Sequence, residues 1–140
     1  MTLKLATVED LKTVVSLCKE LHSNSVYKDV IDLNEEDTAD TVRGILEGNR
    51  SKACALLLLI DNKPVGVLVA SYVEHIFNKK EKTAVELAFF IKEDYRSYSS
   101  LKDLLAAYRY WAKQIGCTSI MQGKLKNKNE VESYTIRRLK

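Results

Sequence analysis

The chain has 140 residues, of which 46% are hydrophobic and 29% are charged, with one proline and five glycines. This length and composition predict one domain around one core and exclude a disordered, fibrous or disulfide-dependent protein. A net charge of +3 is too small to indicate nucleic-acid binding by itself, and no apolar run approaches the roughly 20 residues of a membrane span. The start of the chain lacks the apolar core and cleavage site of a signal peptide, so we expect a cytoplasmic protein.

The first elements in chain order are a short strand and two helices. The run LKLA at 3–6 predicts a strand, and Thr7 with Asp10 has the spacing of a capping box. Acidic residues in LNEEDTAD suit the first turn of a second helix, which ends near Gly48. The inward-facing residues of the two helices are Leu11, Val14, Val15, Cys18 and Leu21 in the first, and Val42, Ile45 and Leu46 in the second.

Strands dominate the middle of the chain. ACALLLLI at 53–60 and VGVLVASYVEHIF at 65–77 flank DNKP, which has the length of a hairpin loop, so we expect antiparallel pairing. A polar loop, NKKEKT at 78–83, leads to the strand AVELAFFI at 84–91. A helix then runs to Gly116, a short strand CTSIM follows at 117–121, and a polar tail ends the chain. The strand, helix, strand unit predicts a parallel crossover in an α/β or α+β sandwich on a mixed sheet.

The cysteines and histidines indicate no cross-link and no metal. Cys18, Cys54 and Cys117 lie far apart in apolar stretches, where each suits a small buried hydrophobic side chain. His22 and His75 share no metal-ligand spacing with each other or with a cysteine, so zinc has no support.

One carboxylate lies inside the strand at 84–91. Alternation places Glu86 on one face with Ala88 and Phe90, and Val85, Leu87, Phe89 and Ile91 on the other. A carboxylate there is costly unless it is hydrated or paired. Two interpretations stay open: Glu86 contacts water near a sheet end, or it is a general base whose pKa is raised by partial burial.

The segment EDYRSYSSLKD leads from this strand into a helix. The first amides of a helix have no internal partners and carry the positive end of its dipole, which favours phosphate. Arg96 adds a charged fork of donors, and Ser97, Ser99 and Ser100 add hydroxyls. The alternative is that Ser99 or Ser100 caps the helix, with Asp103 completing a box and Arg96 at the surface.

In this chain order, the segments resemble the GNAT superfamily of acetyl-coenzyme A-dependent N-acetyltransferases. ELAFFIKEDYR resembles the family's strand with its glutamate base and the start of its R/Q-x-x-G-x-G/A pyrophosphate loop. LKLATVEDLKTVVSLCKEL resembles the first strand and helix, and IDNKPVGVLVAS a family hairpin, so nearly the whole chain is covered. The loop departs from the motif, because Ser99 and Leu101 replace its two glycines. Such replacements cost on the order of 1 to 2 kcal/mol where glycine's positive φ is needed.

The resemblance implies a mixed sheet flanked by helices, in the order strand, two helices, three strands, helix, strand and a last helix. It implies direct transfer of acetyl from acetyl-CoA to a primary amine of a small molecule or protein. Glu86 would be the base and Tyr134 the acid, although a plain packing role for Tyr134 is an equal alternative. The cofactor-binding residues implied are Phe89, Ile91, Arg96, Ser97, Tyr98, Ser99, Ser100, Leu101 and Asn127, with Asn129 close to the last; either asparagine could instead end a loop.

The family continues past its last helix into two more strands, whereas this sequence stops at Lys140. We expect one GNAT-like domain over 1–140 that lacks those strands and leaves an open sheet edge. Three outcomes stay open: a partial reading frame, a partner chain such as a homodimer covering the edge, or ESYTIRRLK itself forming a strand.

The alternative to an enzyme is a catalytically inactive protein that keeps the fold for binding or structure, as the altered loop would permit. A third hypothesis is a nucleic-acid-binding accessory protein that uses its lysine loops. The resemblance places acceptor-facing residues on variable loops, around 23–33 and 74–80, with Tyr27, Tyr72 and His75 as candidates to line the cleft. A core or surface role for each of the three is the alternative.

Overall fold

The computed structural model describes the backbone of residues 1–140, and the side chains of all of them except Leu125, Val131 and Glu132. Six strands form one sheet in the sequential order β1-β2-β3-β4-β5-β6. They are β1 (Thr2–Leu5), β2 (Ala53–Ile60), β3 (Lys63–His75), β4 (Asn78–Ile91), β5 (Ser119–Asn127) and β6 (Glu130–Arg138). The α-helices are α1 (Leu11–Ser23), α2 (Tyr27–Val30), α3 (Glu35–Glu47) and α4 (Tyr98–Gln114), and single 3-10 turns precede α1 and α4.

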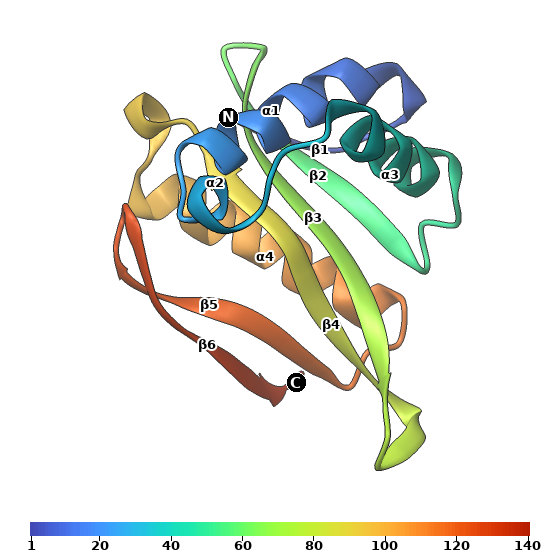
Figure 1. Ribbon diagram of the computed structural model, residues 1–140. Coiled ribbons are helices and arrows are strands. Elements are labelled where there is room, and N and C mark those ends of the chain that lie inside the picture. Colours follow the sequence, from blue (N-terminus) through green and yellow to red (C-terminus); the bar gives the residue numbers. More distant parts are fainter.

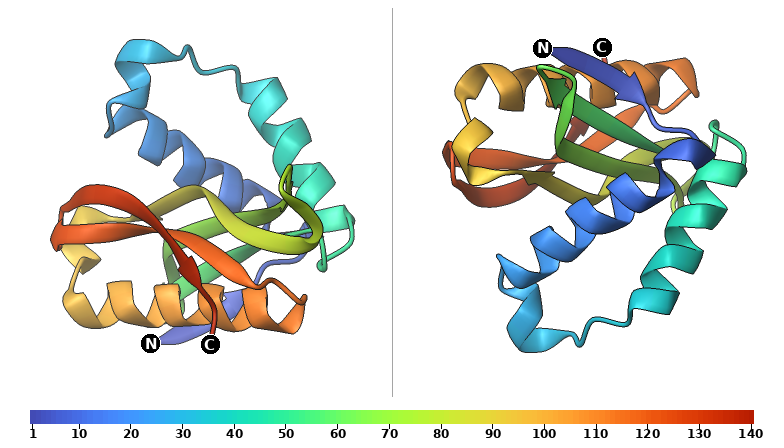
Figure 2. Two further views of the ribbon diagram at one scale, coloured as in Figure 1. Left: turned by 90° about the horizontal axis from the view of Figure 1, so that it is seen from below. Right: turned by 90° about the horizontal axis from the view of Figure 1, so that it is seen from above.

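Helices cover both faces of the sheet (Figure 1, Figure 2). On the face that we call the α1 side, α1 and α3 bury Val14, Leu17, Val42 and Leu46 against the sheet. On the opposite face, the α4 side, the core is built by α4, chiefly by Leu104 and Tyr108. Every neighbouring strand pair is antiparallel except β4 and β5, which are parallel. The predicted mixed sheet flanked by helices and the parallel crossover are therefore confirmed.

The capping chemistry at the first helix is also confirmed. The amide of Thr7 donates to Oδ2 of Asp10 at 2.9 Å, which begins a 3-10 turn that runs directly into α1. Asp61 and Asn62 form the β2–β3 turn with φ of 52° and 62°. Asp and Asn are among the residues that tolerate this left-handed region, as a two-residue hairpin turn requires.

The segment 78–83, predicted as a polar loop, is instead the first part of β4. Only Ile76 and Phe77 separate β3 from β4, and the two strands form a long hairpin whose tip projects beyond the sheet (Figure 1). The prediction was wrong because a two-stranded ribbon satisfies its peptide groups by pairing, whatever its side chains face. A polar sequence can therefore remain a strand there.

The end of the chain is a strand, not the last helix that the family resemblance implied. β6 pairs antiparallel with β5, with Ile136 opposite Met121 and Tyr134 opposite Gly123. The β-branched pair Thr135 and Ile136 suits a pleated surface. Of the three outcomes considered for the sheet edge beside β5, the chain's own last segment forms a strand on it.

Candidate functional site

A slot opens between β4 and β5. The two strands pair at only two positions, Thr83 with Ser119 and Ala84 with Ile120, and then diverge (Figure 1). In the backbone that the structure describes, residues 85–91 of β4 consequently have no strand partner on the edge that faces β5. A strand edge of this kind presents a row of N–H and C=O groups to any extended molecule that enters.

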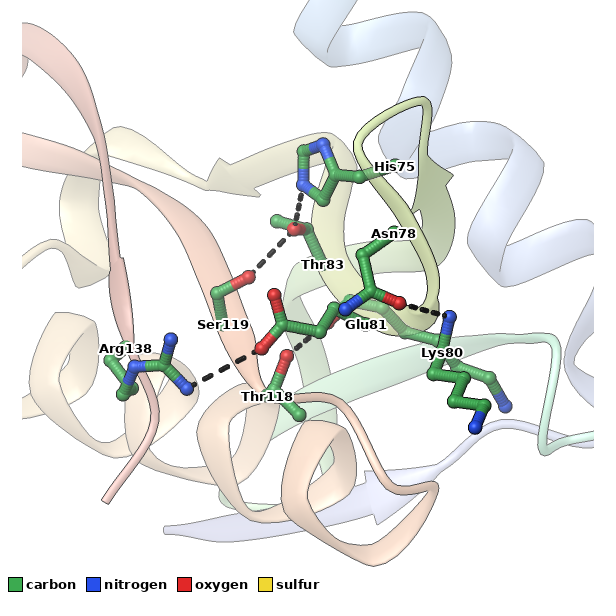
Figure 3. Close-up of polar contacts among 9 residues, drawn as sticks. His75, Asn78, Lys80, Glu81, Thr83, Thr118, Ser119 and Arg138 are labelled. Atoms are coloured by element: carbon green, nitrogen blue, oxygen red, sulfur yellow. Dashed lines mark hydrogen bonds and ion pairs between the residues drawn. The ribbon is translucent and has the colours of Figure 1, made fainter.

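The closed end of the slot is held by side chains (Figure 3). The hydroxyl of Thr83, which is fully buried, shares a hydrogen bond of 2.7 Å with Oγ of Ser119 and also contacts Nε2 of His75. We call His75, Thr83 and Ser119 the clasp. Beside the clasp, Arg138 and Glu81 form an ion pair at 3.6 Å. The clasp joins β3, β4 and β5 at the point where the slot begins.

A β-bulge reverses the predicted orientation of Glu86. In the β3–β4 register, Ala70 lies opposite Glu86 and Val69 lies opposite Ala88, so Leu87 is the extra residue. Ala70 belongs to the α4-side core, and Leu87 lines a cavity on the α1 side together with residues of α1. Glu86 therefore faces the α4 side and no longer shares a face with Ala88. The alternation argument failed because a bulge places two successive residues opposite one.

The Glu86 carboxyl group lies in a dry environment. Burial raises its pKa to about 7, and a hydrogen bond from the backbone of Gly123 on β5 opposes part of that rise. Its Oε2 is buried and has no hydrogen-bond partner among the described residues. Because Gly123 lies across the slot, Glu86 spans the two strands just beyond the clasp. A carboxyl group with this pKa can exchange a proton near neutral pH.

Tyr134 lies on β6, opposite Gly123, and is 59% exposed. Partial desolvation of the phenol, and secondarily the charges of Glu86 and Tyr27, raise its pKa. The phenol is therefore protonated at neutral pH and can donate a proton. Tyr27 comes from α2, so charges on α2 and on β4 both affect Tyr134.

The amides at the start of α4 are only partly free. Ser97 caps the helix: its amide donates to Oγ of Ser100 at 3.0 Å, and the amide of Ser100 donates to Oγ of Ser97 at 3.0 Å. The amide of Leu101 donates to the Ser97 carbonyl. In the part of the chain that the structure describes, no hydrogen bond is found for the amides of Tyr98 and Ser99. The alternative of a cap at Ser99 or Ser100 completed by Asp103 was wrong, because the helix begins earlier.

The glycine-free loop is not strained. The non-glycine residues with positive φ in the described backbone are Asp61 and Asn62, so residues 96–101 need no glycine. Ser97 is extended, with φ of −151°, and Tyr98 already belongs to α4. The conformational penalty expected for replacing the motif's glycines is therefore absent.

Arg96 crosses the open end of the slot. Its Nε donates to the Ile91 carbonyl at 2.6 Å, and its guanidinium group lies over the ring of Phe90, 5.6 Å from the centroid. A longer bond of 3.4 Å reaches Oδ1 of Asn129 in the β5–β6 turn. In that turn, Asn127 accepts a hydrogen bond from the amide of Asn129 at 2.8 Å, so its side chain holds the hairpin. Arg96 thus links the end of β4 to the turn after β5.

The structure brings some of the predicted site residues together and separates others. Glu86, Arg96 and the amides of Tyr98 and Ser99 come from β4 and the segment that follows it, at the border of the slot, whereas Tyr134 comes from β6 on the other side of β5. The side chains of Ile91 and Leu101, at 2% and 3% exposure, instead belong to the α4-side core, as Phe89 does in part. Those residues can reach a ligand through their backbone but not through a free side chain. The bulge at Leu87 and the clasp were not predicted, and no local sequence signal marks either.

A second hollow lies on the α1 side, between the first helices and β4. This cavity of about 340 Å³ is lined by residues of α1, α2, α3 and the loop between the last two, with Leu87 of β4. Tyr27 lines it. Tyr72 and His75 do not: Tyr72 lies under the ammonium group of Lys82, and His75 belongs to the clasp.

The slot fits an extended acyl carrier such as acetyl-CoA. The unpaired edge of β4 can take the amide groups of a pantetheine arm as a strand would. Two free amides at a helix N-terminus and the Arg96 guanidinium group suit a diphosphate. In the described residues, no group of three histidine, cysteine, aspartate or glutamate side chains could hold a metal ion, and no helix has the length and apolarity to cross a membrane.

The comparisons with known proteins agree with this geometry. The model of the acetyltransferase (GNAT) family matches residues 16–135, and a comparison with curated proteins gave no match. A mutant of the protein BH1408 from Bacillus halodurans has a TM-score of 0.72 at 19% identity, with 90% of this chain and 83% of that chain covered. The aminoglycoside 6'-N-acetyltransferase AAC(6')-IG from Acinetobacter haemolyticus has a TM-score of 0.69 at 21% identity, with 86% and 77% covered.

A third solved structure, AAC(6')-Iy in complex with the bisubstrate analogue CoA-S-monomethyl-acetylneamine, has a TM-score of 0.71 at 15% identity. The match covers 89% of this chain and 80% of that chain. At these identities the solved structures show a shared fold and nothing finer.

Proposed function

This chain belongs to the GNAT acetyltransferase family, and from that premise we propose that it transfers the acetyl group of acetyl-CoA to an amine. The observation that carries the proposal is the slot: in the described backbone β4 and β5 pair at two positions, which leaves the β5-facing edge of residues 85–91 without a strand partner. The family uses acetyl-CoA as its acyl donor, and the slot has the strand edge and the helix N-terminus that such a donor needs.

The residues that would hold the cofactor are ordered along the slot. The backbone edge of β4 from Val85 to Ile91 would accept the pantetheine arm. The amides of Tyr98 and Ser99, with the guanidinium group of Arg96, would bind the diphosphate. Because Arg96 already lies at the open end of the slot, it can turn from Asn129 to a phosphate with little rearrangement. When bound, acetyl-CoA supplies a thioester whose C–S bond breaks as the amine nitrogen forms the new C–N bond.

Glu86 would be the base that prepares the amine. An alkyl amine with a pKa near 10.4 is neutral in only about one of a few thousand molecules at pH 7. A carboxylate whose pKa is about 7 is ionised above neutrality and is closer to the amine in basicity than an ordinary glutamate. Its unpartnered Oε2 would receive the ammonium proton, directly or through a water molecule.

Tyr134 would protonate the sulfur that leaves as a thiolate. A thiolate with a pKa near 8.5 is a better leaving group than an alkoxide, so this assistance contributes less than the base. The phenol of Tyr134 lies on β6, beyond β5, whereas Glu86 lies on β4. The two groups would therefore act from opposite sides of the reacting atoms.

Titration calorimetry with acetyl-CoA and a thiol-release assay with primary amines test this proposal together. We expect saturable binding to the wild-type protein and amine-dependent release of free CoA. Arg96→Ala should weaken binding about tenfold or more, since it removes charge-assisted hydrogen bonds. Lys113→Ala, at the other end of α4, serves as the matched control and should bind as the wild type does. Absence of binding at millimolar acetyl-CoA would refute the proposal.

One observation favours a second candidate function, a binding module without catalysis. Ser97 and Ser100 satisfy each other's amides, so fewer donors face the slot than an uncapped helix would offer. Such a module would bind CoA or an acyl-CoA and release no thiol. Binding in calorimetry without thiol release over a broad panel of amines would select this candidate.

A further inference from the structure

The α1-side cavity has apolar walls and an acidic rim. Its walls include Leu21 of α1, Ile31 and Leu33 of the loop before α3, and Leu87 of β4. Two carboxylates, Asp32 and Asp37, also line it. No lysine or arginine is among the lining residues that the structure describes. The chemistry therefore favours an apolar body that carries positive charge.

The two carboxylates are available to a ligand. Neither Asp32 nor Asp37 has an ion-pair partner among the described side chains, whereas the neighbouring Glu35 and Asp40 are paired with Lys19 and Arg43. The amide of Asp37 is bonded to the Asn34 side chain, which leaves its carboxylate outside the helix cap.

The segment that forms most of the cavity lining is acidic, whereas the whole chain is basic. Residues 20–47, which form most of its lining, carry eight acidic and two basic side chains in a chain whose net charge is +3, and acidic groups remain in excess after Glu35 pairs with Lys19 and Glu20 with Lys92. Clefts lined by one sign of charge attract ligands of the other sign. A cation is therefore drawn to this opening in an otherwise basic protein.

The cavity adjoins the slot. Leu87, which forms its wall on β4, is 55% exposed and directly follows Glu86 in the bulge. The charges of Tyr27 at the cavity and of Glu86 in the slot both raise the pKa of Tyr134, so the two spaces share an electrostatic influence on one side chain. A molecule anchored in the cavity can consequently reach over the edge of β4 to the position where Glu86 would take a proton.

We propose that this cavity receives the acceptor substrate as an alkyl diamine or polyamine, with one ammonium group held by Asp32 and Asp37 and another amine extended into the slot. The apolar walls of the cavity contact the alkyl chain. A short polar amine cannot fill this cavity. An anchoring ammonium group must stay charged while the reacting amine becomes neutral, so the acceptor needs at least two amines. This inference rests on the proposed acetyl transfer for its second half, but the binding of the diamine does not.

Calorimetry on the full chain at low salt, with saturating CoA present, tests the proposal through three probes of similar length: hexamethylenediamine, hexylamine and ε-aminocaproate. We expect the diamine to bind about five- to tenfold more tightly than hexylamine, and ε-aminocaproate to bind most weakly. Asp32→Asn and Asp37→Asn should each weaken diamine binding about two- to fivefold, and about tenfold together, because the carboxylates are exposed. Hexylamine binding should change less.

Glu36→Gln is the matched control, since it removes the same charge from the same turn of α3 without lining the cavity. Retained CoA binding shows that each variant is folded. Equal affinities for diamine and hexylamine, or a loss with Glu36→Gln as large as with Asp37→Asn, would overturn the proposal. Diamine binding without thiol release would refute acetyl transfer and leave the cavity assignment standing. Thiol release with no preference for the diamine would support acetyl transfer and refute the cavity assignment.

Discussion

At the scale of single residues, the decisive feature is a glutamate placed in a dry position by a bulge. The pKa of Glu86, about 7, follows from burial that one hydrogen bond from Gly123 offsets only in part. The free Oε2 is what a proton acceptor requires and what a purely structural carboxylate avoids. Burial of the Glu86 carboxyl group destabilises the fold, and the same burial raises its pKa into the range that suits a catalytic base.

Removing this carboxylate should change the pH dependence of transfer. In the wild type, kcat/KM should rise as pH increases through about 7, where Glu86 ionises. Glu86→Gln should lower the rate near pH 8 about a hundredfold and abolish that inflection, because general bases contribute roughly 10² or more. The rate loss of Glu86→Gln should become smaller as the pH approaches the pKa of the amine, because the amine is then neutral without a base. Initial rates from pH 6 to 10 measure this, with Glu47→Gln at the exposed end of α3 as the control, and an unchanged profile would remove Glu86 from the base role.

The same residue makes a prediction about stability. The pKa of Glu86 is raised on folding, from 4.5 to about 7, so the native state holds its proton more tightly than the unfolded chain does. The free energy of unfolding should therefore fall as pH rises from about 4.5 to beyond 7. Glu86→Gln should remove this loss and stabilise the protein at pH 8 by an amount on the order of 3 kcal/mol, with little effect at pH 4.5. Urea unfolding at both pH values decides, and a destabilised variant at pH 8 would contradict the burial argument.

At the scale of elements, the N-terminus of α4 is stabilised by its own serines. Ser100, at 2% exposure, accepts from the Ser97 amide and donates to the Tyr95 carbonyl. Ser100→Ala should lower the free energy of unfolding by about 1 kcal/mol, as the loss of a helix cap does. Ser99→Ala, in the same turn and exposed, should have almost no effect. Equal losses from the two variants in urea unfolding would rule out the capping box.

The clasp makes a separate prediction for the closed end of the slot. Thr83→Val keeps the volume of the side chain but removes its bonds to Ser119 and His75. We expect a loss of about 1 to 3 kcal/mol, because the remaining hydroxyl of Ser119 loses its partner. The same change at the exposed Thr135 of β6 should cost far less. Chemical denaturation of both variants checks this, and equal costs would mean that the clasp contributes nothing.

Local chemistry predicted much of the fold at this scale. Thr7 with Asp10, and Asp61 with Asn62, marked a helix start and a hairpin, because caps and turns depend on residues close in sequence. The strand nature of 78–83 and of β6 was missed, since each depends on a partner strand. The bulge at Leu87 was missed for a related reason: it is fixed by the register against Val69 and Ala70. The sequence identified Glu86 as a candidate, but it could not predict the face of the sheet to which its side chain points.

At the scale of the whole molecule, α4 keeps the two walls of the slot in place. This helix of 17 residues, about 25 Å long, is the crossover from β4 to β5. Tyr108 donates to the Met121 carbonyl on β5 at 2.7 Å, and Trp111 donates to the Arg50 carbonyl before β2 at 2.8 Å. The divergence of β4 from β5 is thus braced from the α4 side and left open on the side where β5 and β6 carry no helix (Figure 1). The slot is therefore maintained by the packing of α4 and is part of the fold itself.

The central claim is that the unpaired edge of β4 is the binding site for an acyl carrier. A crystal structure of the protein grown with millimolar CoA tests it most directly. We predict continuous density between β4 and β5, with the pantetheine amides bonded to the backbone of residues 85–91 and the diphosphate at the amides of Tyr98 and Ser99 beside Arg96. Density for CoA elsewhere, or an empty slot whose mouth Arg96 and Asn129 keep closed, would contradict the account.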